Sequence, residues 1–65
     1  MNVLETMAYE LIPEDGSTVT TQKISKEMSV TFTVAAHTLS SLCEKGYIER
    51  FGMLHSEGFD WRRTE

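Results

Sequence analysis

The stretch that decides the fold is residues 23–42, KISKEMSVTFTVAAHTLSSL, in which two helical patterns are separated by a short turn. In the first pattern, Ile24 and Met28 stand four residues apart and are the expected buried positions. Ser29 and Val30 form the turn. The second pattern is an apolar stripe at positions i, i+4 and i+7, which consists of Ala35, Leu39 and Leu42. This spacing predicts two helices joined by a tight turn.

Residues that begin and end helices stand on either side of these patterns. Thr20 or Thr21 can cap the first helix, because a threonine hydroxyl accepts hydrogen bonds from the free amides of a first turn. Thr31 is placed to cap the second helix in the same way. Gly46 follows Lys45 and can adopt the left-handed conformation that stops this helix.

Another short helix is expected before this pair. Four apolar residues at i, i+3, i+4 and i+7 form one face of this helix, namely Leu4, Met7, Ala8 and Leu11. Pro13 and the following 14–16 (EDG) end this helix. The run 17–20 (STVT) then favours a short strand. We therefore expect a helix and a strand ahead of the helical pair.

After Gly46 the apolar period changes from about 3.6 to 2, which is typical of strands. Residues 47–54 are expected to form one strand and residues 59–63 the returning strand. The turn is expected at 55–58, where Gly58 can adopt a positive φ. Phe59 and Trp61 share one side of the returning strand and are expected in the core, with Arg63 on the same side at its end.

Length and composition predict one small folded domain over residues 1–65. The chain is 40% hydrophobic, and its single cysteine, Cys43, cannot form an internal disulfide. The amino-terminal residues lack a basic segment followed by a long apolar run, so we expect neither a signal peptide nor a membrane span. These features indicate a soluble, cytoplasmic protein with no membrane partner.

The order helix, short strand, helix, turn, helix, hairpin resembles the winged helix-turn-helix superfamily of small bacterial and phage transcriptional regulators. The residues that carry this resemblance are Thr20, Ile24, Met28, Val30, Thr31, Leu39, Leu42, Glu44-Lys45-Gly46, Tyr47-Ile48 and Glu49-Arg50. Regulators of pilus operons, and MarR-like domains without their dimerisation helices, are nearest in size and plan. The resemblance implies an α+β fold of three helices with a C-terminal β-hairpin wing. It also implies sequence-specific binding of double-stranded DNA, with the third helix in the major groove.

The third helix carries the candidate base-contacting residues. Thr33, Val34 and His37 lie in its first turns, and Ser41 lies on the flank of the same face. Hydroxyls and imidazole can hydrogen-bond to base edges, and a valine can contact a thymine methyl. Residues 28–42 contain no lysine or arginine, so the phosphate contacts must come from elsewhere. The candidates for these contacts are Thr31, Lys23, Lys26, Arg50, Arg62 and Arg63.

The distribution of charge leaves a second function open. The net charge is −4, and residues 1–19 alone contain four carboxylates and no lysine or arginine. This acidic end is either a solvated face or a docking surface for another protein. The alternative function is thus an adaptor or antirepressor that binds a regulator or a polymerase subunit through the first or third helix. In either case we expect a monomer, or a dimer that assembles on DNA.

An enzyme is not expected. Cys43 lies about 120° around the third helix from His37, so the two cannot form a nucleophile pair or a shared metal site. The sequence also lacks a glycine-rich phosphate loop and a pair of carboxylates placed for acid and base catalysis. We therefore expect no catalytic residues, no bound metal and no cofactor.

Overall fold

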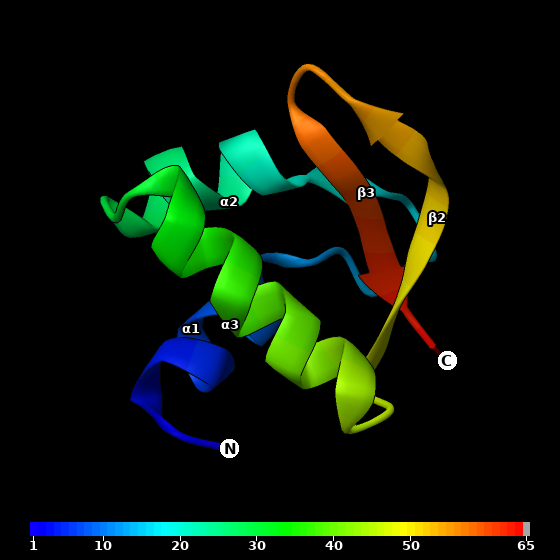
Figure 1. Cartoon of the computed structure of the whole chain (residues 1–65). Helices are drawn as coiled ribbons and strands as arrows, with labels where there is room; N and C mark the ends of the chain where they lie inside the picture. Colours follow the sequence, from blue (N-terminus) through cyan, green and yellow to red (C-terminus); the bar gives the residue numbers. More distant parts are fainter. Residues whose placement is uncertain (65) are drawn as a thin grey trace.

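The computed structural model describes residues 1–64. Within them the chain forms three α-helices and a three-stranded antiparallel sheet (Figure 1). In chain order the elements are α1 (Val3–Leu11), β1 (Val19–Thr20), α2 (Thr21–Met28), α3 (Phe32–Glu44), β2 (Ile48–His55) and β3 (Gly58–Arg63). The predicted α+β class is confirmed, and the arrangement is compatible with the predicted winged helix.

A threonine is the N-cap of both α2 and α3. Thr20 caps α2, because its Oγ1 accepts a hydrogen bond from the Lys23 amide at 3.0 Å. Thr31 caps α3 by accepting from the Val34 amide at 3.2 Å. Ser29 ends α2 with a φ of 58°, which reverses the chain between the two helices. Of the two residues considered for the α2 cap, Thr20 is therefore the one that the fold uses.

The predicted stop of α3 at Gly46 is confirmed. Gly46 has a φ of 86°, and its amide donates to the Cys43 carbonyl at 3.0 Å. The next amide, that of Tyr47, donates to the Leu42 carbonyl at 3.1 Å. These two bonds form a Schellman motif, which satisfies the last carbonyls of the helix. The motif also turns the chain directly into β2.

The central strand of the sheet is β3, with β1 on one side and β2 on the other. The pairing of β2 with β3, called the hairpin below, is regular as far as Phe51 opposite Asp60 and then shifts, so that His55 pairs with Gly58. Residues 52–54 therefore bulge opposite a single residue. As a result, Met53 and Leu54 are 84% and 66% exposed.

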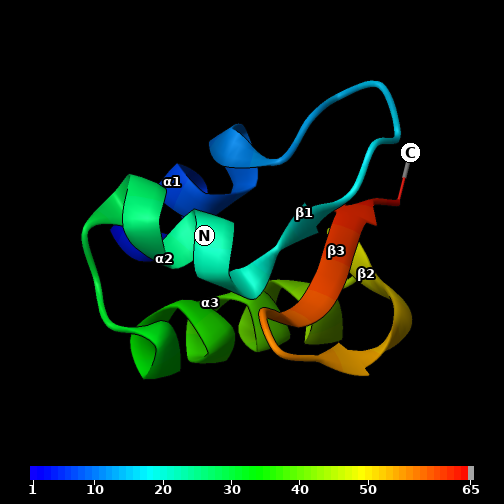
Figure 2. The same ribbon diagram turned by 90° about the horizontal axis from the view of Figure 1, so that it is seen from above.

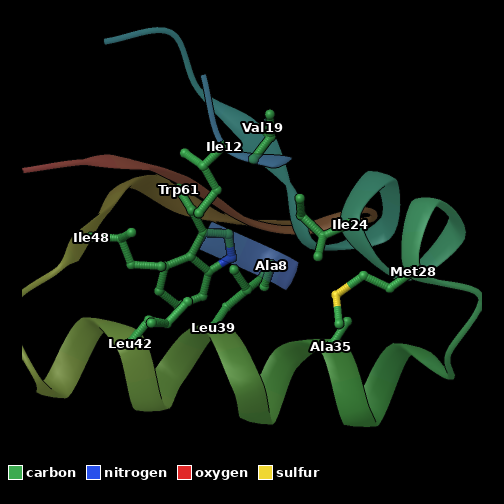
Figure 3. Packing of buried hydrophobic residues seen from close by; sticks show 10 residues of the cluster. All are labelled: Ala8, Ile12, Val19, Ile24, Met28, Ala35, Leu39, Leu42, Ile48 and Trp61. Carbon is green, nitrogen blue, oxygen red and sulfur yellow. The ribbon is translucent and has the colours of Figure 1, made fainter. Parts of the chain in front are cut away.

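Ten residues from all six elements and the segment after α1 form one core (Figure 3). They are Ala8, Ile12, Val19, Ile24, Met28, Ala35, Leu39, Leu42, Ile48 and Trp61. Trp61 lies between the sheet and α3, and its indole Nε1 donates to Thr21 Oγ1 at 2.8 Å. The Thr21 hydroxyl donates in turn to the Phe59 carbonyl at 3.2 Å. The predicted core positions on α2, α3 and β3 are confirmed, with Phe59 half-buried.

Gly58 occupies the tightest point between the sheet and the helices. Its φ is 93°, as the turn requires, and it is buried. A Cβ atom at this position would lie 2.7 Å from the Thr21 Cβ and 2.8 Å from the Phe32 Cζ. Glycine is therefore needed here both for the backbone conformation and for the close approach of α2 and α3.

The predicted apolar face of α1 packs on the core only in part. Ala8 is buried and the half-buried Leu11 packs against the core, whereas Leu4 and Met7 are 41% and 43% exposed. The inward face of α1 instead presents Glu5 and Ala8, followed by Ile12 beyond the helix end. The small Ala8 side chain allows a close contact with the core. The polar contacts of Glu5 fix this rotation.

Glu5 belongs to the acidic end that is predicted to be either a solvated face or a docking surface, but its side chain is only 3% exposed. Ser41 Oγ donates to its carboxylate at 2.5 Å, and Lys45 Nζ lies 3.0 Å from both oxygens. The Asn2 amide donates to the same group and closes a capping box. These hydrogen bonds lower the pKa of Glu5 to about 2. The bond from Ser41 contributes most, followed by those from Lys45 and Asn2. The carboxylate therefore stays ionised and ties α1 to the end of α3.

None of the helices in residues 1–64 has the length and apolar character needed to cross a membrane. Viewed from above, α3 runs along one edge of the molecule, with α1 and α2 on its inner side and the sheet at one end (Figure 2). This arrangement leaves the outer side of α3 uncovered along its length.

Candidate nucleic-acid interface

The outer side of α3 carries a row of exposed polar and small side chains. Its inner side is fixed by the buried residues Ala35, Leu39 and Leu42, so the opposite side must face solvent. We call this row the α3 outer face, and it consists of Thr33, Val34, His37, Ser40 and Glu44. All five are exposed, and Val34 is exposed by 37%.

Three of the four predicted base-contacting residues lie together at the start of this face. Thr33 and His37 are four residues apart and therefore adjacent on one side of the helix, with Val34 at its edge. Within residues 1–64 neither the Thr33 hydroxyl nor the His37 imidazole hydrogen-bonds to another residue. Their polar atoms are therefore available to a ligand.

Ser41 is separated from this group. Its hydroxyl donates to Glu5, and the side chain is half-buried where α3 meets α1. Ser40, which was not among the predicted contact residues, is exposed and continues the face three residues after His37. The spacing i, i+4, i+7 from Thr33 leads to Ser40, so the helical period contained the signal that distinguishes these two serines.

Two of the predicted phosphate-contacting lysines lie on α2. Lys23 and Lys26 are exposed and line an open groove of about 280 Å³ between α2 and the turn of the hairpin. The Gln22 amide donates to the Glu57 carbonyl at 3.0 Å, which holds the turn against the start of α2. The carboxylates of Glu27 and Glu57 also line this groove. The groove thus presents cations and anions in equal number.

Arg50 lies on the hairpin beside a pocket that α3 also lines. Its guanidinium carbon lies 4.8 Å from the centre of the Phe59 ring, on the side of the sheet that faces the helices. A pocket of about 120 Å³ separates this arginine from α3, and its lining consists of Ser40, Cys43, Glu44, Arg50 and Trp61. The Arg50 side chain is therefore the cation of the hairpin that borders the α3 outer face.

The other two arginines predicted to contact phosphate, Arg62 and Arg63, lie apart from α3, whereas Thr31 is the N-cap of that helix. Arg62 Nε is 2.6 Å from Glu49 Oε2, and its guanidinium covers the Phe51 ring at 4.5 Å. By strand alternation these residues are on the side of the sheet that faces away from the helices. Arg63 covers the ring of Tyr9 at 4.1 Å and donates to its carbonyl at 2.9 Å. Both arginines are held by partners within the chain.

The charge around the α3 outer face is balanced. Lys23, Lys26 and Arg50 stand against three carboxylates, those of Glu27, Glu44 and Glu57. Long-range attraction of phosphate is therefore weak, and binding has to depend on local contacts. In the part of the chain that the structure describes, no three His, Cys, Asp or Glu side chains gather in a way that would hold a metal ion.

Comparison with known proteins adds no relative. The chain matches no protein-family model, no curated protein and no solved structure. The functional proposals therefore depend on the surfaces of the molecule itself.

Proposed function

We propose that this protein is a winged helix-turn-helix regulator of transcription that binds double-stranded DNA in a sequence-specific manner, with α3 in the major groove. The observation that carries this proposal is the α3 outer face, where Thr33, Val34 and His37 are exposed beside one another. The polar side-chain atoms of Thr33 and His37 have no hydrogen-bond partner among the described residues.

The first turns of α3 supply the contacts to bases. A threonine hydroxyl and an imidazole nitrogen can bond to the donors and acceptors that base pairs present in the major groove. Val34 offers a methyl surface to thymine, and small side chains allow the helix to approach the bases closely. Ser40 extends the same row toward Arg50. The number of groups fits a short recognition sequence for each copy of the protein.

Phosphate contacts come from both sides of α3. The hydroxyl of Thr31 lies at the start of the helix, Lys23 and Lys26 lie on α2, and Arg50 lies on the hairpin. Three cations that each neutralise one phosphate would give a slope of about −2.7 for log affinity against log salt. Such a small slope corresponds to modest affinity for a single copy, and a second copy that binds beside it on DNA would add its own contacts.

The decisive experiment is the selection of bound fragments from random duplex DNA, followed by titration of the enriched sequence at several salt concentrations. We expect one short sequence to be enriched, with a tighter dissociation constant than a scrambled duplex of equal length. The proposal is overturned if no sequence is enriched and binding at low salt does not exceed that of the scrambled duplex.

A further inference from the structure

The outward side of α1 is an apolar surface. Val3, Leu4 and Met7 are 75%, 41% and 43% exposed, whereas Leu11, at the end of the helix, is half-buried and packs against the core. Helical spacing places Val3, Leu4 and Met7, called the α1 outer face below, on one side of the helix. Three large apolar side chains of α1 are thus exposed, while its inward side carries Glu5 and Ala8.

Contacts within the chain prevent α1 from turning this surface inward. The Glu5 carboxylate holds Ser41 at 2.5 Å and Lys45 at 3.0 Å, and its loss from these partners would leave a buried charge. Rotation of α1 toward the core would break all of these bonds. The exposure of Leu4 and Met7 is therefore built into the fold.

Exposed carboxylates lie on α1 and in the segment that follows it. Glu10 lies on the helix, and Glu14 and Asp15 follow its end; all three are exposed. Hydrogen bonds from Ser17 lower the pKa of Asp15, so this carboxylate stays ionised. Residues 1–19 contain no lysine or arginine.

Lys45 and Arg63 contact α1 from other elements, but Lys45 is paired with Glu5 and Arg63 with Tyr9. The exposed acidic side chains of α1 and of the segment after it therefore favour a partner with positive charge.

A second copy of the chain does not fit this surface. Two copies would bring two sets of exposed carboxylates together, which opposes association. Charge complementarity favours a partner that carries lysine or arginine beside an apolar stripe.

We infer that the α1 outer face is a docking site for a basic amphipathic helix of another protein. The apolar stripe of that helix would cover Val3, Leu4 and Met7, and its cations would face Glu10 and the carboxylates after α1. In Figure 2, α1 lies on the inner side of α3, away from the α3 outer face. The docking site and the proposed DNA surface can therefore be occupied at the same time.

A synthetic helix with leucine along one side and lysine elsewhere is the probe that tests this inference. Two matched peptides serve as controls: one has glutamate in place of every lysine, and the other has the leucine and lysine positions scrambled. In fluorescence anisotropy titrations, we expect the leucine and lysine helix to bind at least about tenfold more tightly than either control.

Variants of the protein locate the site. Met7→Glu is expected to weaken binding of the probe by at least about tenfold, because it places a charge in the apolar contact. Val3→Glu, at the most exposed position of the face, should have the same direction of effect without disturbing the core. Leu54→Ser removes a comparable exposed apolar side chain from the hairpin and should leave the affinity unchanged. Circular dichroism melting confirms that each variant is folded.

Several results would overturn the inference. These are no detectable binding of the leucine and lysine helix, equal binding of either control peptide, or affinity that neither Met7→Glu nor Val3→Glu lowers. Analytical ultracentrifugation of the protein alone provides a further check. A concentration-dependent dimer that Met7→Glu abolishes would show that the occupant is a second copy, and would also overturn it.

Discussion

The two helices α1 and α3 bury opposite kinds of side chain. The longer helix, α3, buries Ala35, Leu39 and Leu42 and exposes small polar residues. In contrast, α1 buries Glu5 beside Ala8 and exposes Leu4 and Met7. The two helices pack against each other, and the end of α3 supplies the hydroxyl and the ammonium that hold the buried carboxylate. The orientation of a short helix is thus decided by its neighbour rather than by its own apolar pattern.

The largest expected effect compares one apolar residue from each helix. Leu39→Ala should lower the free energy of unfolding by about 2 to 5 kcal/mol, because it leaves a cavity at a fully buried position. In a domain of this size such a loss approaches the whole stability. Met7→Ala, the matched control, should cost well under 1 kcal/mol, since Met7 is 43% exposed. Equal losses in urea titrations would show that α1 is oriented the other way.

The next effect concerns the turn that places Lys45 beside Glu5. Gly46→Val should cost about 1 to 3 kcal/mol, because a β-branched residue strains the left-handed backbone at a φ of 86°. A Cβ atom at this position would meet nothing within 4 Å, so the cost comes from the backbone alone. Gly46→Asn should therefore be much milder, since asparagine tolerates this conformation. Thermal melting of the two variants separates strain from crowding, and equal melting temperatures would contradict this explanation.

A smaller effect should appear as a pH dependence of stability. The folded-state pKa of Glu5 is lowered from 4.5 to about 2, so the unfolded state binds more protons between these values. The contribution of Glu5 is therefore complete above pH 4.5 and is lost as the pH falls through about 2. The melting temperature of the parent should exceed that of Glu5→Gln at neutral pH, and this difference should shrink across that interval. A difference that stays constant from pH 5 to pH 2 would mean that the carboxylate is not ionised in the contact.

Local rules were sufficient to predict α3 and insufficient to predict α1. The caps of α3 at Thr31 and Gly46 and its apolar stripe each depend on residues within one or two turns of the chain. The rotation of α1 depends on Ser41 and Lys45, which are 36 and 40 residues away from Glu5. No periodicity in residues 3–11 contains that information. Apolar periodicity alone therefore did not reveal that Glu5 faces the core.

The candidate DNA surface also contains residues that local sequence predicts and residues whose positions depend on distant contacts. The exposure of Thr33, Val34 and His37 can be predicted from the helical period once the buried stripe of α3 is known. The partners of Arg62 and Arg63 cannot, because strand pairing with Glu49 and packing on Tyr9 decide where these side chains lie. The choice between Ser40 and Ser41 was within reach of the helical period, although only the contact with Glu5 explains why Ser41 is turned inward.

The smallest expected effect is measured by comparing His37 with Ser41, and it tests whether the α3 outer face contacts DNA. His37→Ala should reduce discrimination between the preferred duplex and a scrambled duplex by about 1 kcal/mol, the lower end for the loss of a base contact. Ser41→Ala should leave discrimination unchanged and lower the melting temperature instead, because its hydroxyl bonds to Glu5. Both are measured by titration of labelled DNA, with melting curves recorded for the same samples. If Ser41→Ala changes sequence preference and His37→Ala does not, DNA contacts a different side of α3, and the division of this helix into an outer face for DNA and a flank for α1 is wrong.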